Sequence, residues 1–90
     1  MGRPSALMVA TVEYVVRRLI DDGLVEMEEG RALDVTSHCV NTLAARPLGA
    51  QLVDSISTAL LSSPHVEELF ASDAEIRDII TEFGSVQCRT

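Results

Sequence analysis

The segment SALMVATVEYVVRRLIDDG, residues 5–23, carries the strongest structural signal of the chain. Its large apolar side chains recur at helical spacing, at Met8, Val12, Val15, Val16 and Leu19. Such spacing is typical of an amphipathic helix with one buried face. Ser5 is a favourable N-cap, and Gly23 can adopt the left-handed conformation that often ends a helix. The segment therefore predicts a helix from Ser5 to about Asp22.

Two similar signals follow in the middle of the chain. The segment 32–45 and the segment from about 48 to 62 each place aliphatic side chains on one arc of a helix. Pro47 and Gly49 lie where the first of these segments ends, and both residue types interrupt helices. We therefore predict one helix over residues 32–45 and another over about 48–62.

The last third of the chain also contains helix signals. Pro64, at the first position after a serine cap, predicts a short helix through Phe70. Ser72 and Glu75 have the S-x-x-E spacing of a capping box, and apolar residues at helical spacing follow them. Gly84 is placed to end this final helix.

The segment LVEMEEGR, residues 24–31, is the least helical part of the chain. Its apolar and acidic residues alternate as in a strand, but no second strand pattern offers it a partner, so we interpret it as a connector. Ninety residues are enough for one domain and one core. We therefore expect an all-α fold, a single compact bundle of four to five short helices over residues 1–90, with residues 1–4 and 85–90 loose.

The charge balance excludes several classes of partner. Fourteen acidic residues against seven basic ones give a formal net charge of −7, and such a surface repels phosphate groups and anionic lipids. We therefore expect no direct binding to nucleic acid or to membranes. The N-terminus has no long apolar stretch and does not resemble a signal peptide. Cys39 and Cys88 make no disulfide framework, so we expect a cytoplasmic protein.

No residue pattern indicates an enzyme or a bound cofactor. Cysteine–histidine catalysis needs a thiolate beside a base, but Cys39 is expected in the core and Cys88 in the loose tail. Zinc ligands usually occur in spaced pairs, whereas His38 and Cys39 are adjacent and point about 100° apart on a helix. Together with His65 and Cys88 they make a poor ligand set. We therefore expect no enzymatic activity, no metal and no cofactor.

The triplet Asp54-Ser55-Ile56 resembles a known attachment motif. Acyl carrier proteins, which are also short, acidic and helical, attach phosphopantetheine to the serine of an Asp-Ser-Leu triplet, and this resemblance implies Ser55 as an attachment site. Here isoleucine replaces the leucine, the usual glycine-aspartate lead-in is absent, and Ser55 falls at the edge of the apolar arc of its helix. We therefore interpret Ser55 as structural and keep an acyl- or peptidyl-carrier function as an alternative.

Acidic residues cluster between the first two helices, at Asp21, Asp22, Glu26, Glu28 and Glu29. Calcium-binding loops place oxygen ligands at alternating positions with a glycine sixth, and this segment lacks that order. Acidic residues at the C-terminal end of a helix also oppose its dipole, so the number of acids here has no evident structural reason. A second alternative function is therefore an acidic inhibitor that occupies a basic surface of a target protein.

The apolar face of the first helix is broader than the covering of a small core requires, and the short last helix carries several bulky apolar residues on one face. Apolar surface that stays exposed usually marks an interaction site. We therefore expect a non-enzymatic protein-interaction module, an adaptor, regulatory or assembly subunit, that self-associates as a homodimer. The residues expected at its interfaces are Val9, Val16, Ile20, Ile76, Ile79, Ile80 and Phe83, with Glu26, Glu28 and Glu29 for a basic partner.

Overall fold

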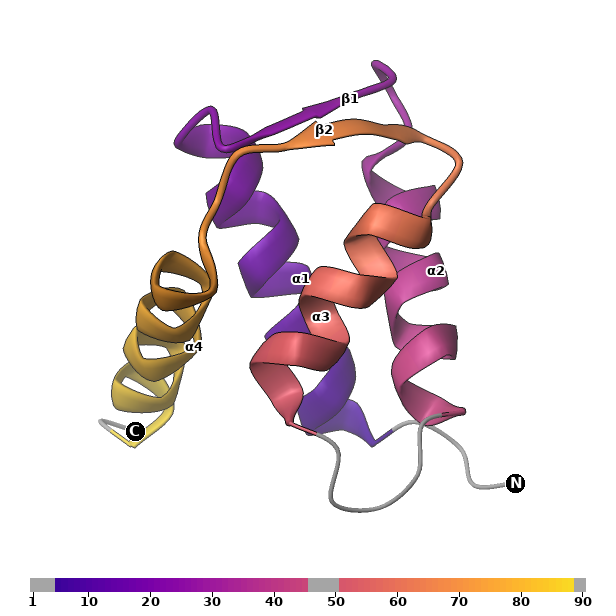
Figure 1. Ribbon diagram of the computed structural model, residues 1–90. Helices are drawn as coiled ribbons and strands as arrows, with labels where there is room; N and C mark the ends of the chain where they lie inside the picture. The colour runs from indigo at the N-terminus through magenta and orange to yellow at the C-terminus, as the bar shows by residue number, and fades with distance from the viewer. Residues whose placement is uncertain (1–4, 46–50, 89–90) are drawn as a thin grey trace.

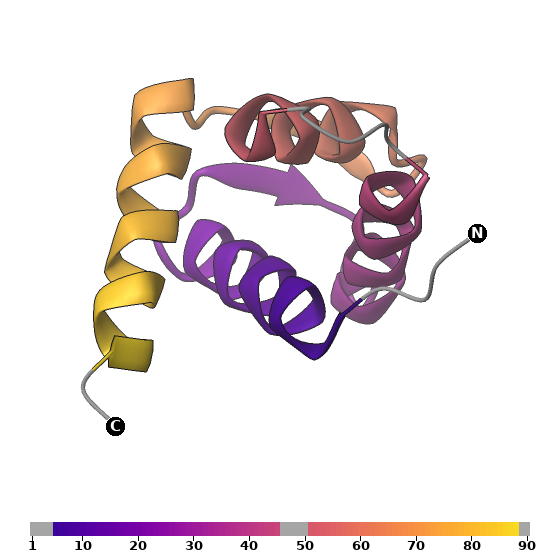
Figure 2. The same cartoon turned by 90° about the horizontal axis from the view of Figure 1, so that it is seen from below.

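The computed structural model describes residues 5–45 and 51–88, which form four helices and two strands. In chain order the elements are α1 (Ala6–Asp21), β1 (Val25–Met27), α2 (Ala32–Ala44), α3 (Leu52–Ser62), β2 (Val66–Leu69) and α4 (Asp73–Cys88). The helices follow one another around a ring, in which α1 contacts both α2 and α4, and the two strands lie across one end (Figure 1 and Figure 2). The fold is therefore mostly helical, as expected, but includes a small sheet.

Helix α1 begins and ends as the sequence predicts. The side chain of Ser5 accepts a hydrogen bond from the Met8 N–H at 3.0 Å, which satisfies one of the free donors of the first turn. Gly23 has a φ of +70°, and the N–H of Leu24 donates to the carbonyl of Leu19 at 2.8 Å. This is the Schellman ending that glycine favours, and it turns the chain toward the strand end of the molecule.

Helices α2 and α3 also agree with the sequence prediction. The predicted helix over residues 32–45 is α2, which Ala45 terminates. The predicted helix over about 48–62 is α3, which the structure describes from Leu52 onward. The interrupting residues Pro47 and Gly49, and the predicted start near position 48, lie outside the described residues.

Helix α4 confirms one prediction and corrects another. Its capping box is formed, because the Glu75 side chain accepts from the Ser72 N–H at 3.0 Å and the Ser72 hydroxyl accepts from the Glu75 N–H at 3.2 Å. The prediction that Gly84 ends this helix is wrong, since α4 continues through Cys88. Gly84 does not take the positive φ of a terminating glycine. The expected loose tail 85–90 is therefore helical as far as residue 88, and its last two residues, like 1–4, lie outside the described part.

The segments that we interpreted as a connector and as a short helix are strands. Residues 24–31 contain β1, which pairs antiparallel with β2. The prediction of a helix from Pro64 through Phe70 is wrong, because β2 occupies this segment. Val25 lies opposite Leu69, so the two strands supply each other with backbone partners that neither segment could find locally.

An irregular register explains why the second strand was missed. Glu26 lies opposite Glu68, but Met27 lies opposite Val66, which leaves Glu67 as an extra residue on β2. A bulge of this kind shifts the alternation of side chains by one position. Val66 therefore packs against the core together with Leu69, although three positions separate them. A strand with a bulge lacks the strict alternation by which strands are recognised in a sequence.

The core lies inside the ring of helices and is almost entirely aliphatic. Its buried members are Val12, Val15, Val16, Leu19, Val35, Cys39, Val40, Leu43, Ile56, Ala59, Leu60, Ile76 and Ile79. The apolar side chains of β1 and β2 pack on the same cluster, so the ribbon covers one end of the core. The outward side of α1, between α2 and α4, is the part of this arrangement that bears on function.

Candidate interaction surface

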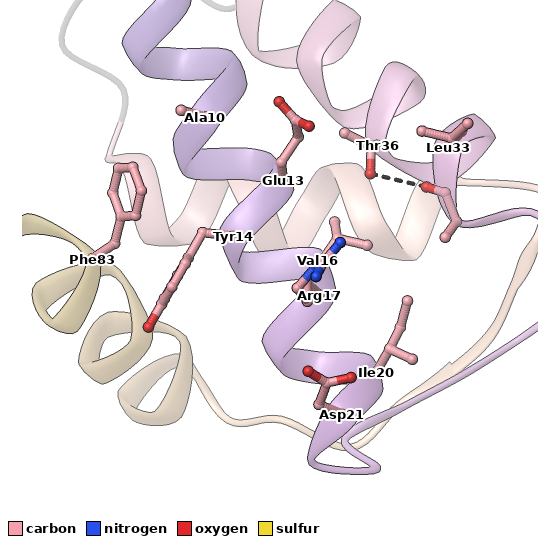
Figure 3. A pocket seen from close by; sticks show the side chains of 11 residues that line it. Ala10, Glu13, Tyr14, Val16, Arg17, Ile20, Asp21, Leu33, Thr36 and Phe83 are labelled. Carbon is pink, nitrogen blue, oxygen red and sulfur yellow. Dashed lines mark hydrogen bonds between the residues drawn. The ribbon is translucent and has the colours of Figure 1, made fainter. Parts of the chain in front are cut away.

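A hollow of about 590 Å³ lies along the outward side of α1, between the start of α2 and the later part of α4 (Figure 3). It is open to solvent and lined by Ala10, Glu13, Tyr14, Val16, Arg17, Ile20, Asp21, Ala32, Leu33, Thr36 and Phe83. Most of these residues come from α1, where they recur at the three- and four-residue spacing of one helix face. We call this region the α1 surface.

The α2 side of the α1 surface is apolar and exposed. Leu33 in the first turn of α2 is 79% exposed, and Ile20 near the end of α1 is 39% exposed. Other large apolar residues are exposed too, namely Leu7, Leu52, Leu61 and Phe70, but none of these four lines the hollow. Leu33 and Ile20 therefore combine exposure with concavity, a combination typical of binding sites.

The α4 side of the α1 surface is held in place by aromatic and charged contacts. The rings of Tyr14 and Phe83 lie 5.1 Å apart at an angle of 43°. Arg18 donates to the Tyr14 hydroxyl at 3.2 Å, forms an ion pair with Glu82 on α4, and contacts Asp22 at 3.3 Å. These contacts, first the bond to Tyr14 and then the one to Glu82, raise the pKa of the Arg18 guanidinium. This side of the hollow is therefore a fixed wall.

Two side chains of opposite charge lie on the outward face of α1, between these walls. Glu13 and Arg17 are both exposed, and they are one turn apart on the same helix face. Neither takes part in an ion pair or a side-chain hydrogen bond with any of the described residues. Arg18 and Arg31, by contrast, each contact two acidic side chains. Glu13 and Arg17 are thus available to a partner.

The structure places the predicted apolar interface residues in different environments. Val16, Ile20 and Phe83 line the α1 surface, Val16 at its buried floor. Val9 and Ile80 are half-buried and pack against the core. The other two, Ile76 and Ile79, are buried inside the core.

Sequence reasoning missed Leu33, Tyr14, Glu13 and Arg17 as members of this surface. A usable signal existed for Leu33, because it lies off the arc that the buried residues Val35 and Cys39 define on α2. A large aliphatic side chain on the polar side of a helix is a candidate for a contact with a partner.

The predicted acidic residues lie on or beside the β-ribbon, at the end of the molecule. Glu26 lies directly opposite Glu68, and the two like charges repel each other across the strands. Glu28 is engaged differently: its carboxylate contacts His65 at 3.0 Å and Arg31 at 3.5 Å. These contacts, the one with His65 first, hold the pKa of the Glu28 carboxyl below its ordinary value. Glu29 is exposed.

Ser55, the attachment site of the carrier alternative, faces the interior. Its side chain is buried, with 1% of the residue exposed, and its hydroxyl oxygen has no hydrogen-bond partner among the described residues. An attached arm requires a hydroxyl that an enzyme can reach. The carrier alternative therefore requires α3 to move away from the core.

The histidines and cysteines considered as zinc ligands lie in separate settings. His38 Nε2 lies 2.9 Å from the Ser62 hydroxyl, and because that hydroxyl donates to the Ala59 carbonyl, His38 is the donor. Cys39 is buried in the core, and burial raises the pKa of its thiol to about 11. Across the described residues, no three His, Cys, Asp or Glu side chains are grouped to hold a metal ion; the Cys88 side chain is outside that set.

Comparisons with known proteins do not assign the chain to a family. No protein-family model, no curated protein and no solved structure matches it. Among the described helices, none is both long and apolar enough to cross a membrane. The functional argument therefore depends on the surface of the molecule itself.

Proposed function

We propose that this protein is a non-enzymatic interaction module that binds a protein partner at the α1 surface. The observation that carries the proposal is the pair Leu33 and Ile20, which are exposed at 79% and 39% beside a hollow. Full burial of a leucine side chain contributes about 1.5–3 kcal/mol. A partner that covers Leu33 gains most of this energy, and it gains a smaller part from Ile20, which is only 39% exposed.

The two walls of the α1 surface support the same proposal. Its α4 wall is fixed by the Arg18 contacts, so binding there requires little ordering of side chains. Glu13 and Arg17 stand between the walls and have no ion-pair partner in the described part of the chain. Aromatic and apolar side chains next to charged ones, as found here, are a common composition of protein interfaces.

Site-specific photo-crosslinking in the host cell tests the proposal. A benzoylphenylalanine residue replaces Leu33 in one version of the chain and Leu61, which is 65% exposed on α3 and outside the hollow, in the matched control. We expect a defined adduct from position 33 that weakens when Ile20→Lys is added, and no such adduct from position 61. Absence of an adduct at position 33, or equal adducts at both positions, contradicts the proposal.

A second candidate function, the acidic inhibitor, is favoured by the pair Glu26 and Glu68. Two like charges directly opposite each other destabilise a two-stranded ribbon, and a basic partner surface would relieve this repulsion. This candidate function predicts a complex that dissociates at high salt concentration. It also predicts that the double variant Glu26→Lys, Glu68→Lys does not bind the partner. Binding that the double reversal leaves unchanged contradicts it.

A further inference from the structure

We propose that the partner at the α1 surface is a second copy of this chain, with the two α1 helices packed antiparallel about a two-fold axis. This inference rests on the proposed function, because it names the occupant of the same surface. In such an interface each copy presents the same patch to the other, so every contact occurs twice. The α1 surface must therefore be complementary to itself.

The charges of the α1 surface are complementary to themselves in this arrangement. Glu13 and Arg17 are four residues apart, or about 6 Å along the helix axis. When the helices are antiparallel and the axis crosses between them at the level of residue 15, midway between Glu13 and Arg17, Glu13 of one copy faces Arg17 of the second copy, and the reverse pair forms as well. Parallel packing would instead place Glu13 against Glu13 and Arg17 against Arg17. The charges therefore select the antiparallel orientation.

The sizes of the side chains fit the same orientation. Toward its N-terminus α1 lines the hollow with the small residue Ala10, and toward its C-terminus it lines the hollow with Ile20, next to Leu33 of α2. Antiparallel packing about this axis brings the bulky Ile20 of each copy against the small Ala10 of the other. Ile20 and Leu33, which the monomer leaves exposed, are covered in this way.

Neither of the new ion pairs has to replace an existing one. Arg18 is committed to Tyr14, Glu82 and Asp22, whereas Glu13 and Arg17 have no ion pair with the described residues. The formal charge of −7 on each copy opposes association. This repulsion acts mainly over long distances, and the screening length is about 8 Å at an ionic strength of 0.15 M. The pairs in direct contact persist under these conditions.

A charge-swap experiment by analytical ultracentrifugation of the complete chain tests the arrangement at physiological ionic strength. We expect the wild type to be in a concentration-dependent monomer–dimer equilibrium. By symmetry, Glu13→Arg or Arg17→Glu each turns two attractive contacts into two repulsive ones, so each variant alone should associate at least about tenfold more weakly. A mixture of the two variants should recover association, because one copy then carries acids at both positions and the other carries bases.

Matched controls separate this effect from net charge and from misfolding. Arg77→Glu changes the charge of the chain by the same amount as Arg17→Glu, on an exposed position of α4 that does not line the hollow, and should leave the dimer unchanged. Recovery in the mixture also shows that both single variants are folded. The double variant Glu13→Arg, Arg17→Glu should dimerise like the wild type.

Three results would overturn the inference: a wild type that stays monomeric, single variants that dimerise as the wild type does, or a mixture that fails to recover. The proposed function can survive such a failure. If the adduct at position 33 contains a different protein, the α1 surface still binds a protein partner, but the partner is not a second copy of this chain. Absence of any adduct specific to position 33 would contradict both.

Discussion

Replacement of Ser55 by alanine should make the protein more stable. Ser55 is buried on α3 beside core residues such as Ile56, and its hydroxyl oxygen has no hydrogen-bond partner among the described residues. Its backbone is normally helical, because its N–H donates to the Gln51 carbonyl at 2.9 Å. The substitution therefore removes an uncompensated polar atom and leaves the helix intact.

The size of the effect follows from three contributions. A buried polar group without a partner costs about 1–3 kcal/mol, and Ser55→Ala removes this cost. Loss of one small atom leaves a cavity that costs only a few tenths of a kcal/mol at about 24 cal/mol per Å³. Alanine also has the higher helix propensity, by roughly 0.5 kcal/mol. We expect the free energy of unfolding to rise by about 1–3 kcal/mol.

Urea denaturation followed by circular dichroism measures this difference. With an m-value of about 1–2 kcal/mol/M, the midpoint should move up by roughly 1–2 M. The matched control is Ser57→Ala on the same helix, where the hydroxyl donates to the Asp73 carboxylate at 3.1 Å. The change in helix propensity is the same in both variants, so their difference reports the surroundings of the hydroxyl. Protein concentration is kept equal, because dimerisation would shift the midpoint.

One outcome would refute the reasoning. If Ser55→Ala lowers the free energy of unfolding, or raises it no more than Ser57→Ala does, the Ser55 hydroxyl makes a stabilising hydrogen bond in solution. The carrier alternative makes a different prediction: Ser55→Ala would abolish function whether or not the stability changes.

Three further predictions concern the ribbon, pH and the buried thiol. Glu68→Lys should raise the free energy of unfolding by about 0.5 kcal/mol in urea titrations, because it turns the repulsion with Glu26 into attraction. The lowered pKa of Glu28 stabilises the fold above the ordinary value of 4.5, so the melting temperature should fall as the pH drops below this value, and less steeply in His65→Gln. Cys39, with a thiol pKa of about 11, should resist thiol reagents at neutral pH until urea unfolds the chain.

Each of these three predictions has a control. Glu67→Lys makes the same charge change at the bulge, where no residue lies directly opposite, and should have the smaller effect. His38→Gln removes a histidine that does not contact Glu28 and should leave the acid branch of the melting curve as it is. A Cys88→Ser background restricts labelling to Cys39. Equal effects of test and control, or labelling of the native protein, would contradict the respective prediction.

The helical framework was largely predictable because its signals are local. The cap at Ser5, the glycine ending at Gly23 and the box formed by Ser72 and Glu75 each join residues within about one turn. The same holds for the buried faces, which helical spacing reveals without knowledge of the neighbours. The α1 surface was predictable only in part: Val16, Ile20 and Phe83 were among the predicted interface residues and line it.

The errors arose where the outcome depends on distant segments. Leu33 is ordinary as an isolated exposed leucine, and it becomes a candidate contact only because α1 and α4 complete a hollow beside it. The strand β1 finds its partner after two intervening helices, and the bulge at Glu67 hides the alternation of β2. Gly84 could end a helix or continue it, and in the folded chain α4 continues past it.

The amino-acid sequence by itself determined where most helices begin, how α1 and α4 are capped and which of their faces are apolar. These properties depend on neighbours within one or two turns of the chain. Only the tertiary structure decided that two short segments pair as a ribbon, that Ser55 faces the core and that the α1 surface stays open beside Leu33. The physical reason is that these features depend on contacts between segments far apart in the chain, and no local pattern records such contacts.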